Sequence, residues 1–208
     1  MADLYEVEGP EDPALDLAAE ALAAGELAVV PTDTVYGVAA RPDVAGATER
    51  LFEAKRRPWR LMLPVLVAGT GDARRIAWFD VAADKLAARF WPGALTMVLP
   101  RTDLSMSWEL GEARDTVGVR VPANEMVLEL LARTGPLAVT SANRSGDPTP
   151  SDCAGVRVVL GDAVAVYLCT GVLDSDLPST VVDLMGPGHR VLREGAIGAR
   201  DIDLTVAY

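Results

Sequence analysis

Apolar positions along the chain switch repeatedly between helical spacing and short strand-like runs. Leu15, Ala18 and Leu22 recur on one helix face, and the apolar run at 27–30 that follows is ended by Pro31. The same alternation predicts helices that begin near Pro13, Asp43, Asp80, Met126 and Ser151, and strands over 27–30, 63–67, 95–99, 116–121, 137–140, 164–168, 180–184 and 191–193. Interleaved helices and strands indicate an α/β or α+β fold with a mixed sheet.

The segments between these elements are polar or rich in turn-forming residues. Residues 32–37 form a hydroxyl-rich turn, residues 101–115 are expected to be a surface loop, and residues 143–151 contain Gly, Pro, Ser and Thr. The strand at 116–121 alternates like one with a single solvent-facing side. The chain has no internal repeat or linker, so its 208 residues are expected to form one domain over 1–208.

The chain is acidic as a whole but contains one basic stretch. The chain has 19 Lys and Arg against 30 Asp and Glu, a net charge of −11, which argues against an extended nucleic-acid surface. Lys55-Arg56-Arg57-Pro58 nevertheless places three consecutive cations at the end of the second predicted helix. We expect them to point outward from one fixed place. A solvated helix C-terminus and a site for a polyanionic small molecule explain this stretch equally well.

Cysteine and histidine content excludes several other sites. Cys153 and Cys169 lack metal-site spacing and are too few for a disulfide framework, so we expect buried free thiols. The single histidine, His189, follows Gly-Pro-Gly and predicts a tight turn rather than a triad member. No apolar run approaches the ~18–20 residues of a membrane span, and the acidic N-terminus lacks signal-peptide features. A cytoplasmic protein without membrane contact is expected.

Several predicted strands end in hydroxyl, amide or cationic side chains. Residues 30–34, 139–143, 179–180 and 192–193 are the main examples. Strand ends bind ligands in open sheets, and these groups suit phosphate and carboxylate oxygens, although each segment alone is also typical of a turn. Walker A, G-x-G-x-x-G and G-x-S-x-G motifs are absent from the sequence. The chemistry expected is therefore positioning and electrostatic stabilisation, as in transfer at phosphorus.

These segments carry a family resemblance. Seven blocks, in family order between about residues 25 and 197, resemble the YrdC-like family of threonylcarbamoyl-AMP synthases: 31–37 (PTDTVYG), 55–58 (KRRP), 91–96 (WPGALT), 117–122 (VGVRVP), 141–143 (SAN), 179–183 (STVVD) and 192–197 (LREGAI). Each block is weak alone, but the Lys-x-Arg and Ser-x-Asn pair at the right distance from the first block is highly specific. The chain resembles the short, single-domain form.

The resemblance implies both a fold and a reaction. The fold is a twisted mixed sheet flanked by helices (YrdC/RibB-like) around a concave, positively charged cavity. The reaction is that of a nucleotidyltransferase, which converts L-threonine, bicarbonate and ATP, with Mg²⁺ as cofactor, into L-threonylcarbamoyl-AMP and pyrophosphate. A separate tRNA threonylcarbamoyl-transfer complex is the implied downstream partner, so weak or no direct tRNA binding is expected.

The family pattern also implies site residues. It places L-threonine near Thr34 and Arg120, with Ser141 and Ser179 as hydroxyl contacts. It places the ATP phosphates at Lys55 and Arg57, which carry the catalytic role. Further nucleotide contacts are implied at Thr116, Asn143, Ser151 and Arg193. Metal ligands are not assigned. Arg56 is then the solvated cation of the cluster.

Three positions depart from the family pattern. Many relatives have His where this chain has Ala68 and Asn124, and Cys169-Thr170-Gly171 replaces a more usual Asp-Gly-Gly. Two alternatives also stay open. One is a carbamoyl-adenylate-forming transferase, which normally belongs to a much larger chain. The other is a non-catalytic RNA-binding module, which the acidic charge opposes.

Overall fold

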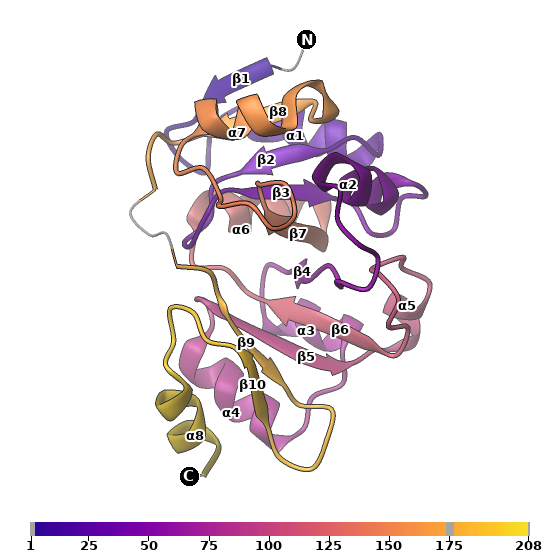
Figure 1. Cartoon of the computed structure of the whole chain (residues 1–208), viewed down its shortest axis with the longest axis vertical. Helices are drawn as coiled ribbons and strands as arrows, with labels where there is room; N and C mark the ends of the chain where they lie inside the picture. Colours follow the sequence, from indigo (N-terminus) through magenta and orange to yellow (C-terminus); the bar gives the residue numbers. More distant parts are fainter. Residues whose placement is uncertain (1–2, 174–176, 208) are drawn as a thin grey trace.

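The computed structural model describes residues 3–173 and 177–207, and within them one mixed sheet runs the length of the molecule with helices on both sides (Figure 1). Ten strands lie in the order β1-β8-β2-β3-β7-β4-β6-β5-β9-β10. The strands are β1 (Asp3–Glu6), β2 (Ala28–Val30), β3 (Gly37–Ala40), β4 (Val65–Leu66), β5 (Leu95–Pro100), β6 (Thr116–Arg120), β7 (Leu137–Ser141), β8 (Val166–Cys169), β9 (Thr180–Asp183) and β10 (Arg190–Arg193).

The helices cover this sheet from both faces. They are α1 (Ala14–Ala23), α2 (Ala47–Lys55), α3 (Thr70–Ile76), α4 (Val81–Phe90), α5 (Asp103–Met106), α6 (Glu125–Thr134), α7 (Cys153–Leu160) and α8 (Ala199–Ala207), with a 3₁₀ turn at Gly161–Ala163. The twisted mixed sheet flanked by helices, expected from the sequence, is confirmed. None of the helices in the described residues is long and apolar enough to cross a membrane.

Apolar side chains on the two faces of the sheet form two cores. Leu15 and Leu22 of α1 pack with Val127 and Leu130 of α6 in one core. The second core takes the buried side chains of α2, α4 and the opposite sheet face, including Phe52. Each fully buried Leu or Phe stabilises the fold by about 1.5–3 kcal/mol, which is why the apolar spacing located these helices.

Helix ends follow local chemistry with small shifts from the prediction. Asp80, near which this helix was expected to begin, caps α4 by accepting a hydrogen bond from Ala83 N at 2.8 Å. Asn124, one of the departures from the family pattern, caps α6 in the same way through Val127 N at 3.1 Å. Asp43 was expected to cap α2 but does not. It pairs with Arg41, and α2 begins only at Ala47, after Gly46 in the left-handed conformation.

Several elements escaped the sequence patterns. β1, β3, α3 and α8 were not predicted, and residues 101–115 contain the short helix α5 instead of being loop throughout. The expectation that β6 has a solvent-facing side is also wrong. Val117 to Arg120 are all buried, because one side of β6 packs on the core and the other forms a cavity wall. His189 lies in the β9–β10 connection, as the turn prediction required.

The two cysteines are not free thiols, so that prediction is wrong. Cys153, at the start of α7, and Cys169, at the end of β8, form a disulfide with a Cα–Cα distance of 5.6 Å. Their separation of 16 residues in sequence gave no sign of this, since α7 and β8 have to pack before the two thiols meet.

Candidate active site

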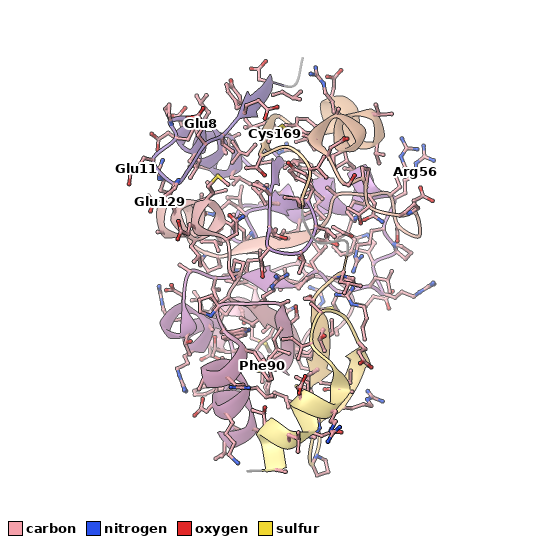
Figure 2. The ribbon with its side chains drawn as sticks, turned by 90° about the vertical axis from the view of Figure 1, so that its left-hand side faces the viewer. Glu8, Glu11, Arg56, Phe90, Glu129 and Cys169 are labelled. Carbon is pink, nitrogen blue, oxygen red and sulfur yellow. A yellow bond between two sulfur atoms is a disulfide. The ribbon has the colours of Figure 1, made fainter. Side chains whose placement is uncertain are left out.

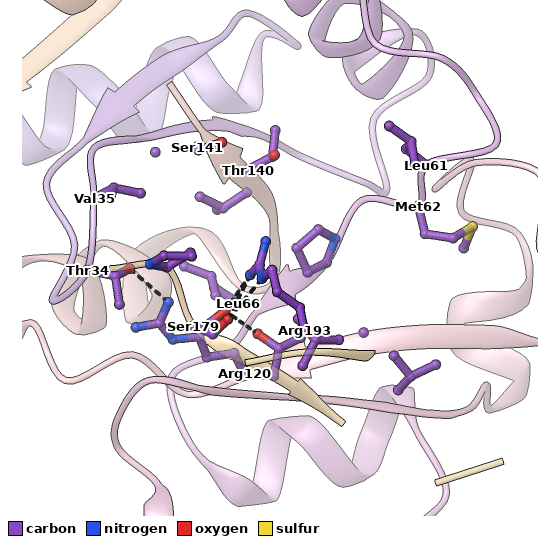
Figure 3. Close-up of a pocket in the computed structure, with 18 of the residues that line it drawn as sticks. Thr34, Val35, Leu61, Met62, Leu66, Arg120, Thr140, Ser141, Ser179 and Arg193 are labelled. Atoms are coloured by element: carbon purple, nitrogen blue, oxygen red, sulfur yellow. Dashed lines mark hydrogen bonds between the residues drawn. The ribbon is translucent and has the colours of Figure 1, made fainter. Parts of the chain in front are cut away.

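A cavity of about 700 Å³ opens on one face of the sheet (Figure 3). Strands β3, β4, β5, β6, β7, β9 and β10 all contribute to its walls. Its lining includes four arginines, Arg57, Arg60, Arg120 and Arg193, and no Asp or Glu is among the described lining residues. Hydroxyl side chains and an apolar wall that includes Leu61, Met62 and Leu66 complete it. The cavity therefore offers cationic, hydroxyl and apolar contacts together.

Strand alternation explains which side chains reach the cavity. Thr116, Gly118 and Arg120 of β6 line it, while Val117 and Val119 between them belong to the core on the other face. Successive strand side chains point to opposite faces, so three alternate positions share one wall. A Cβ on Gly118 would lie 3.4 Å from both Pro64 and Thr96, in ordinary contact, so larger side chains there would extend into the cavity.

Arg120 is held by three different acceptors at the end of β6. Its Nε donates to Gly93 O at 2.9 Å, its Nη1 to Thr34 Oγ1 at 3.1 Å and its Nη2 to Asp33 Oδ1 at 2.6 Å. Burial lowers the pKa of Arg120, and the Asp33 carboxylate opposes that shift. One hydrogen on each terminal nitrogen remains for a ligand, since a guanidinium carries five N–H groups.

The 32–35 turn fixes the Thr34 hydroxyl against Arg120. Thr32 donates its hydroxyl hydrogen to Val35 O at 2.7 Å, so the 3.0 Å contact between the two threonine hydroxyls is donated by Thr34. Thr34 Oγ1 then accepts from Arg120. Sequence reasoning assigned Thr34 a substrate role and included Thr32 only in the hydroxyl-bearing segment 30–34; Thr32 also lines the cavity and orients its neighbour.

A second cluster lies where β5, β9 and β10 meet. Arg193 donates to Ser179 O at 2.8 Å through Nη2 and at 3.1 Å through Nε, and Ser179 Oγ lies 2.9 Å from Thr96 Oγ1. Figure 3 shows Arg193 and Ser179 beside Arg120. Partial desolvation lowers the pKa of Arg193, and the charge of Arg120 lowers it further. The two arginines thus act on one region of the cavity.

Thr180 joins the last two sequence blocks. Its Oγ1 donates to Ile197 O at 2.6 Å and accepts from Gly195 N at 2.9 Å and Ile197 N at 3.0 Å. A Cβ on Gly195 would lie 2.1 Å from Pro178 O, so only glycine fits this close approach. This packing holds residues 193–197 against Ser179.

The three cations at the C-terminal end of α2 point in different directions, contrary to the expectation that all point outward. Arg56 ends the helix in the left-handed conformation at φ 50°, and in Figure 2 its side chain projects from the edge of the molecule. Lys55, before it, is buried, and Arg57, after it, lines the cavity. The solvated interpretation therefore fits Arg56 alone.

Lys55 lies behind the cavity wall rather than in it. Its Nζ donates to Ser141 O, to Asn143 O at 2.6 Å and to Asn143 Oδ1 at 3.1 Å. The amide of Asn143 donates to Arg144 O and Asp147 O, and its Oδ1 accepts from Ser141 Oγ at 2.5 Å. Burial first, and the charge of Arg57 second, lower the pKa of Lys55 to about 7. Lys55 and Asn143 thus fix the turn after β7.

Arg57 is anchored by the chain that follows it. Nε donates to Leu61 O at 2.9 Å and Nη2 to Met62 O at 2.8 Å. Within the part of the chain that is described, Nη1 makes no hydrogen bond. Burial lowers the pKa of Arg57, and Arg193 adds to that shift. Arg57 therefore presents free N–H groups beside a second cation.

The structure brings most of the predicted site residues together. The residues that line the cavity are Thr34, Arg57, Thr116, Arg120, Ser141, Ser179 and Arg193. Lys55, Asn143 and Ser151 do not line it, so a direct contact with nucleotide stays a prediction for these three. Arg60 and Thr149 line the cavity and were missed, and Thr140 lines it although sequence reasoning assigned it no role beyond its place in the 139–143 segment. Arg60 lies two residues beyond the KRRP block, and its charge was the one signal available.

Comparison with known proteins shows the family to which the chain belongs. The family model Sua5/YciO/YrdC, described as telomere recombination, matches residues 20–195. A Mycobacterium tuberculosis protein, provisionally named a threonylcarbamoyl-AMP synthase, is 39% identical over 205 residues, covering 97% of this chain and 94% of its own. A Bacillus subtilis threonylcarbamoyl-AMP synthase is 31% identical, covering 99% of this chain and 60% of its own length.

Solved structures match over nearly the whole chain. Pyrococcus abyssi Sua5 complexed with L-threonine has a TM-score of 0.85 at 31% identity, covering 99% of this chain and 60% of Sua5. Escherichia coli YciO has a TM-score of 0.89 at 26% identity, covering 97% of this chain and 100% of YciO. This chain belongs to the Sua5/YciO/YrdC family. It spans about 60% of the length of Sua5.

Proposed function

We propose that this protein is an L-threonylcarbamoyladenylate synthase, a nucleotidyltransferase that forms L-threonylcarbamoyl-AMP and pyrophosphate from L-threonine, bicarbonate and ATP. The observation that carries the proposal is the cavity. In a chain of net charge −11 it gathers four arginines, together with Thr34, Ser141 and Ser179. The names of the relatives support the same activity, and so does the threonine-bound Sua5 structure.

The Arg120 end of the cavity suits the amino acid. The hydrogens left on Arg120 bind the threonine carboxylate, because a guanidinium fork matches two carboxylate oxygens. Ser141 and Ser179 supply hydroxyl groups on the adjoining walls. Thr34 holds Arg120 in place through its Oγ1.

The Arg57 end suits the triphosphate. Arg57, Arg60 and Arg193 provide charge for the leaving pyrophosphate, and the apolar wall with Thr116 suits the nucleoside. The contacts of Lys55 support a positioning role, in which it fixes the Ser141–Asn143 turn from behind. A phosphate contact would require Lys55 to leave those acceptors. Asn143 and Ser151 would likewise act through the turn they belong to.

The chemistry needs no side-chain nucleophile. The threonine nitrogen attacks the bicarbonate carbon, an N–C bond forms and water leaves. The carbamate oxygen then attacks the α-phosphorus, an O–P bond forms, and the bond to the β-phosphate breaks with release of pyrophosphate. The protein contributes orientation of the two substrates and fixed positive charge around the leaving group.

Mg²⁺ is proposed to enter with ATP. Among residues 3–173 and 177–207 no group of three His, Cys, Asp or Glu side chains is placed to hold a metal ion. Mg²⁺ retains several waters and binds readily through substrate phosphates, so phosphate oxygens would supply most of its ligands, with cavity hydroxyls as the available protein oxygens. When bound it neutralises charge on the leaving pyrophosphate. The product is proposed to pass to a separate tRNA-modifying complex, without tight tRNA binding by this chain.

The direct test is pyrophosphate release from ATP by the purified protein. Release that depends on both L-threonine and bicarbonate is expected. Turnover with carbamoyl phosphate that ignores threonine would assign the carbamoyl-adenylate reaction instead. Tight, salt-sensitive tRNA binding without any release would assign an RNA-binding module.

Replacing Arg57 tests the phosphate end. Arg57→Ala is expected to abolish adenylate formation and to reduce the free energy of unfolding by no more than about 1 kcal/mol, since its partners are two carbonyls near the surface. Arg56→Ala is the matched control, because this exposed neighbour should leave activity unchanged. A fully active Arg57→Ala would refute the role given to it.

A further inference from the structure

We propose that Arg60 is the specificity-determining residue that binds the terminal phosphate of the nucleotide, so that the cavity selects a nucleoside triphosphate over a diphosphate. This rests on the proposed function, which uses Arg60 only as one of three positive charges, and it assigns this side chain a single phosphate. Arg60 lines the cavity, and none of the seven sequence blocks includes it.

The first observation is that Arg60 is an unpaired cation. Its guanidinium makes no hydrogen bond or ion pair with any residue in the described part of the chain, and no Asp or Glu is among the described residues of the cavity lining. The other three lining arginines, Arg57, Arg120 and Arg193, each donate hydrogen bonds to protein acceptors. Arg60 therefore keeps all five of its N–H groups for a ligand.

The second observation is the fixed backbone of the turn over residues 58–61, which carries this side chain. On one side, Glu112 N donates to Trp59 O at 3.0 Å, and the Trp59 ring stacks on the buried Phe52 ring with 4.1 Å between the centroids. On the other side, Arg57 Nε donates to the carbonyl of the last turn residue at 2.9 Å. Because the backbone is already held, only side-chain torsions have to be ordered when a ligand binds, which lowers the entropic cost of binding.

The third observation is the position of this turn along the cavity. In Figure 3, Leu61, the last residue of the turn, lies on the opposite side of the cavity from Thr34. Besides burial, the charge of Arg120 lowers the pKa of Arg193, and the charge of Arg193 lowers the pKa of Arg57. These three guanidinium groups are therefore neighbours in this order, in a row that leads from the threonine end to the turn.

This row of cations matches the order of the phosphates in the proposed reaction. The carbamate formed at the Arg120 end attacks the α-phosphorus, so the α-phosphate lies nearest that end and the γ-phosphate lies furthest along the row. A guanidinium with free N–H groups on both terminal nitrogens binds two phosphate oxygens through its planar fork. Arg60 binds the γ-phosphate in this way, and a diphosphate has no group at this position.

The experiment measures equilibrium binding of α,β-methylene-ATP and α,β-methylene-ADP, which differ only in the γ-phosphate, with Mg²⁺ present and without threonine or bicarbonate. The methylene group prevents cleavage, so the dissociation constants report binding alone. Arg60→Met is expected to bind the triphosphate analogue about five- to twentyfold more weakly than wild type and the diphosphate analogue within about twofold. Retained binding of the diphosphate analogue shows that the variant is folded with its cavity intact.

Arg56→Met is the matched control. It removes the same charge from an exposed neighbour that does not line the cavity. Both dissociation constants are expected to stay within about twofold of wild type, because solvent screens the charge of an exposed side chain.

Other outcomes overturn the proposal. Equal weakening of both analogues in Arg60→Met would mean that Arg60 does not distinguish the γ-phosphate, and unchanged binding of both would mean that it is a solvated surface cation. Wild type that binds neither analogue, or both with the same affinity, would overturn it as well. Wild type that shows the expected difference but releases no pyrophosphate with threonine and bicarbonate would instead refute the proposed reaction and leave the recognition of the triphosphate standing.

Discussion

The β5–β6 hairpin carries a buried arginine at each end, and the two differ in what they bind. Arg101 follows β5 and Arg120 ends β6. The strands are antiparallel, with Pro100 opposite Thr116 and Met97 opposite Val119, so the two side chains lie at opposite ends. Each is 5% exposed, and burial lowers the pKa of both. Burial and charge alone therefore do not separate them.

Their hydrogen-bond partners do separate them. Arg101 donates to four main-chain carbonyls, those of Thr116, Ser105, Trp108 and Ala113, at 2.7–3.3 Å. These bonds fix the 102–115 segment, and Arg101 does not line the cavity. Arg120 binds the side chains of Asp33 and Thr34 and does line it. An arginine bound only to main-chain carbonyls stabilises the fold, whereas one oriented by side chains at a cavity is available for recognition.

The strongest test of this comparison is Arg120→Lys. Lysine keeps the charge but cannot reach three separate acceptors, so at least two charge-assisted hydrogen bonds of about 1.5–3 kcal/mol each are lost. The kcat/KM for L-threonine in pyrophosphate release is expected to fall at least about 100-fold. Arg133→Lys, at a surface site between Asp16 and Glu129, is the control and should stay within about twofold. Equal activity of both variants would remove Arg120 from the site.

Arg101→Met tests the arginine at the other end of the β5–β6 hairpin. Four carbonyls, two of them buried and two part-buried, lose a charged donor, so the free energy of unfolding is expected to drop by about 3 kcal/mol or more in urea denaturation. The KM for L-threonine of the folded protein should not change. Arg114→Met, which removes an exposed arginine of the same segment, should have little effect on stability. A stable Arg101→Met protein with a raised KM would reverse the comparison.

Lys55 is the intermediate case, because it is bound to carbonyls like Arg101 but lies next to the cavity. Its pKa is about 7 in the folded protein, against 10.5 ordinarily. Between these values the unfolded chain binds more protons, so this group makes the fold more stable as pH rises. Below about pH 7 Lys55 is charged in the folded protein, and the free-energy cost of burying that charge has its full size. The cost disappears near pH 10.5, where the unfolded chain also loses the proton.

The measurement compares wild type with Lys55→Met, which has no titrating group. The difference in unfolding free energy, wild type minus variant, should increase between pH 7 and pH 10. A constant difference over that range would show that the three oxygen acceptors keep Lys55 protonated in the folded state.

Much of the fold was available from the sequence, because burial enforces periodicity. Apolar spacing located α4, β5, β7 and the start of α6 to within a residue or two. β3 was missed because its residues 37–40 are small and follow directly on the 32–37 turn, so no polar break separates them. α8 was missed because of its alternating charges, which hide the contribution of Ile202 to the core.

The candidate site was likewise predictable from the sequence only in part. Sequence blocks named Thr34, Arg57, Arg120, Ser141 and Ser179, all of which line the cavity. The blocks could not show that Lys55 turns inward, since that depends on where the turn after β7 lies. Nor could they pair Asp33 with Arg120, which are 87 residues apart.

The sequence by itself determined most of the elements, the family and most of the polar groups in the cavity, because local spacing and residue type carry that information. Only the tertiary structure decided which groups interact with each other. It decided which cation binds main-chain carbonyls and which binds a carboxylate, and it brought Cys153 and Cys169 together in a disulfide. Partnership between distant residues is set by how strands and helices pack. The chemistry of each charged group therefore becomes specific only once its neighbours are in place.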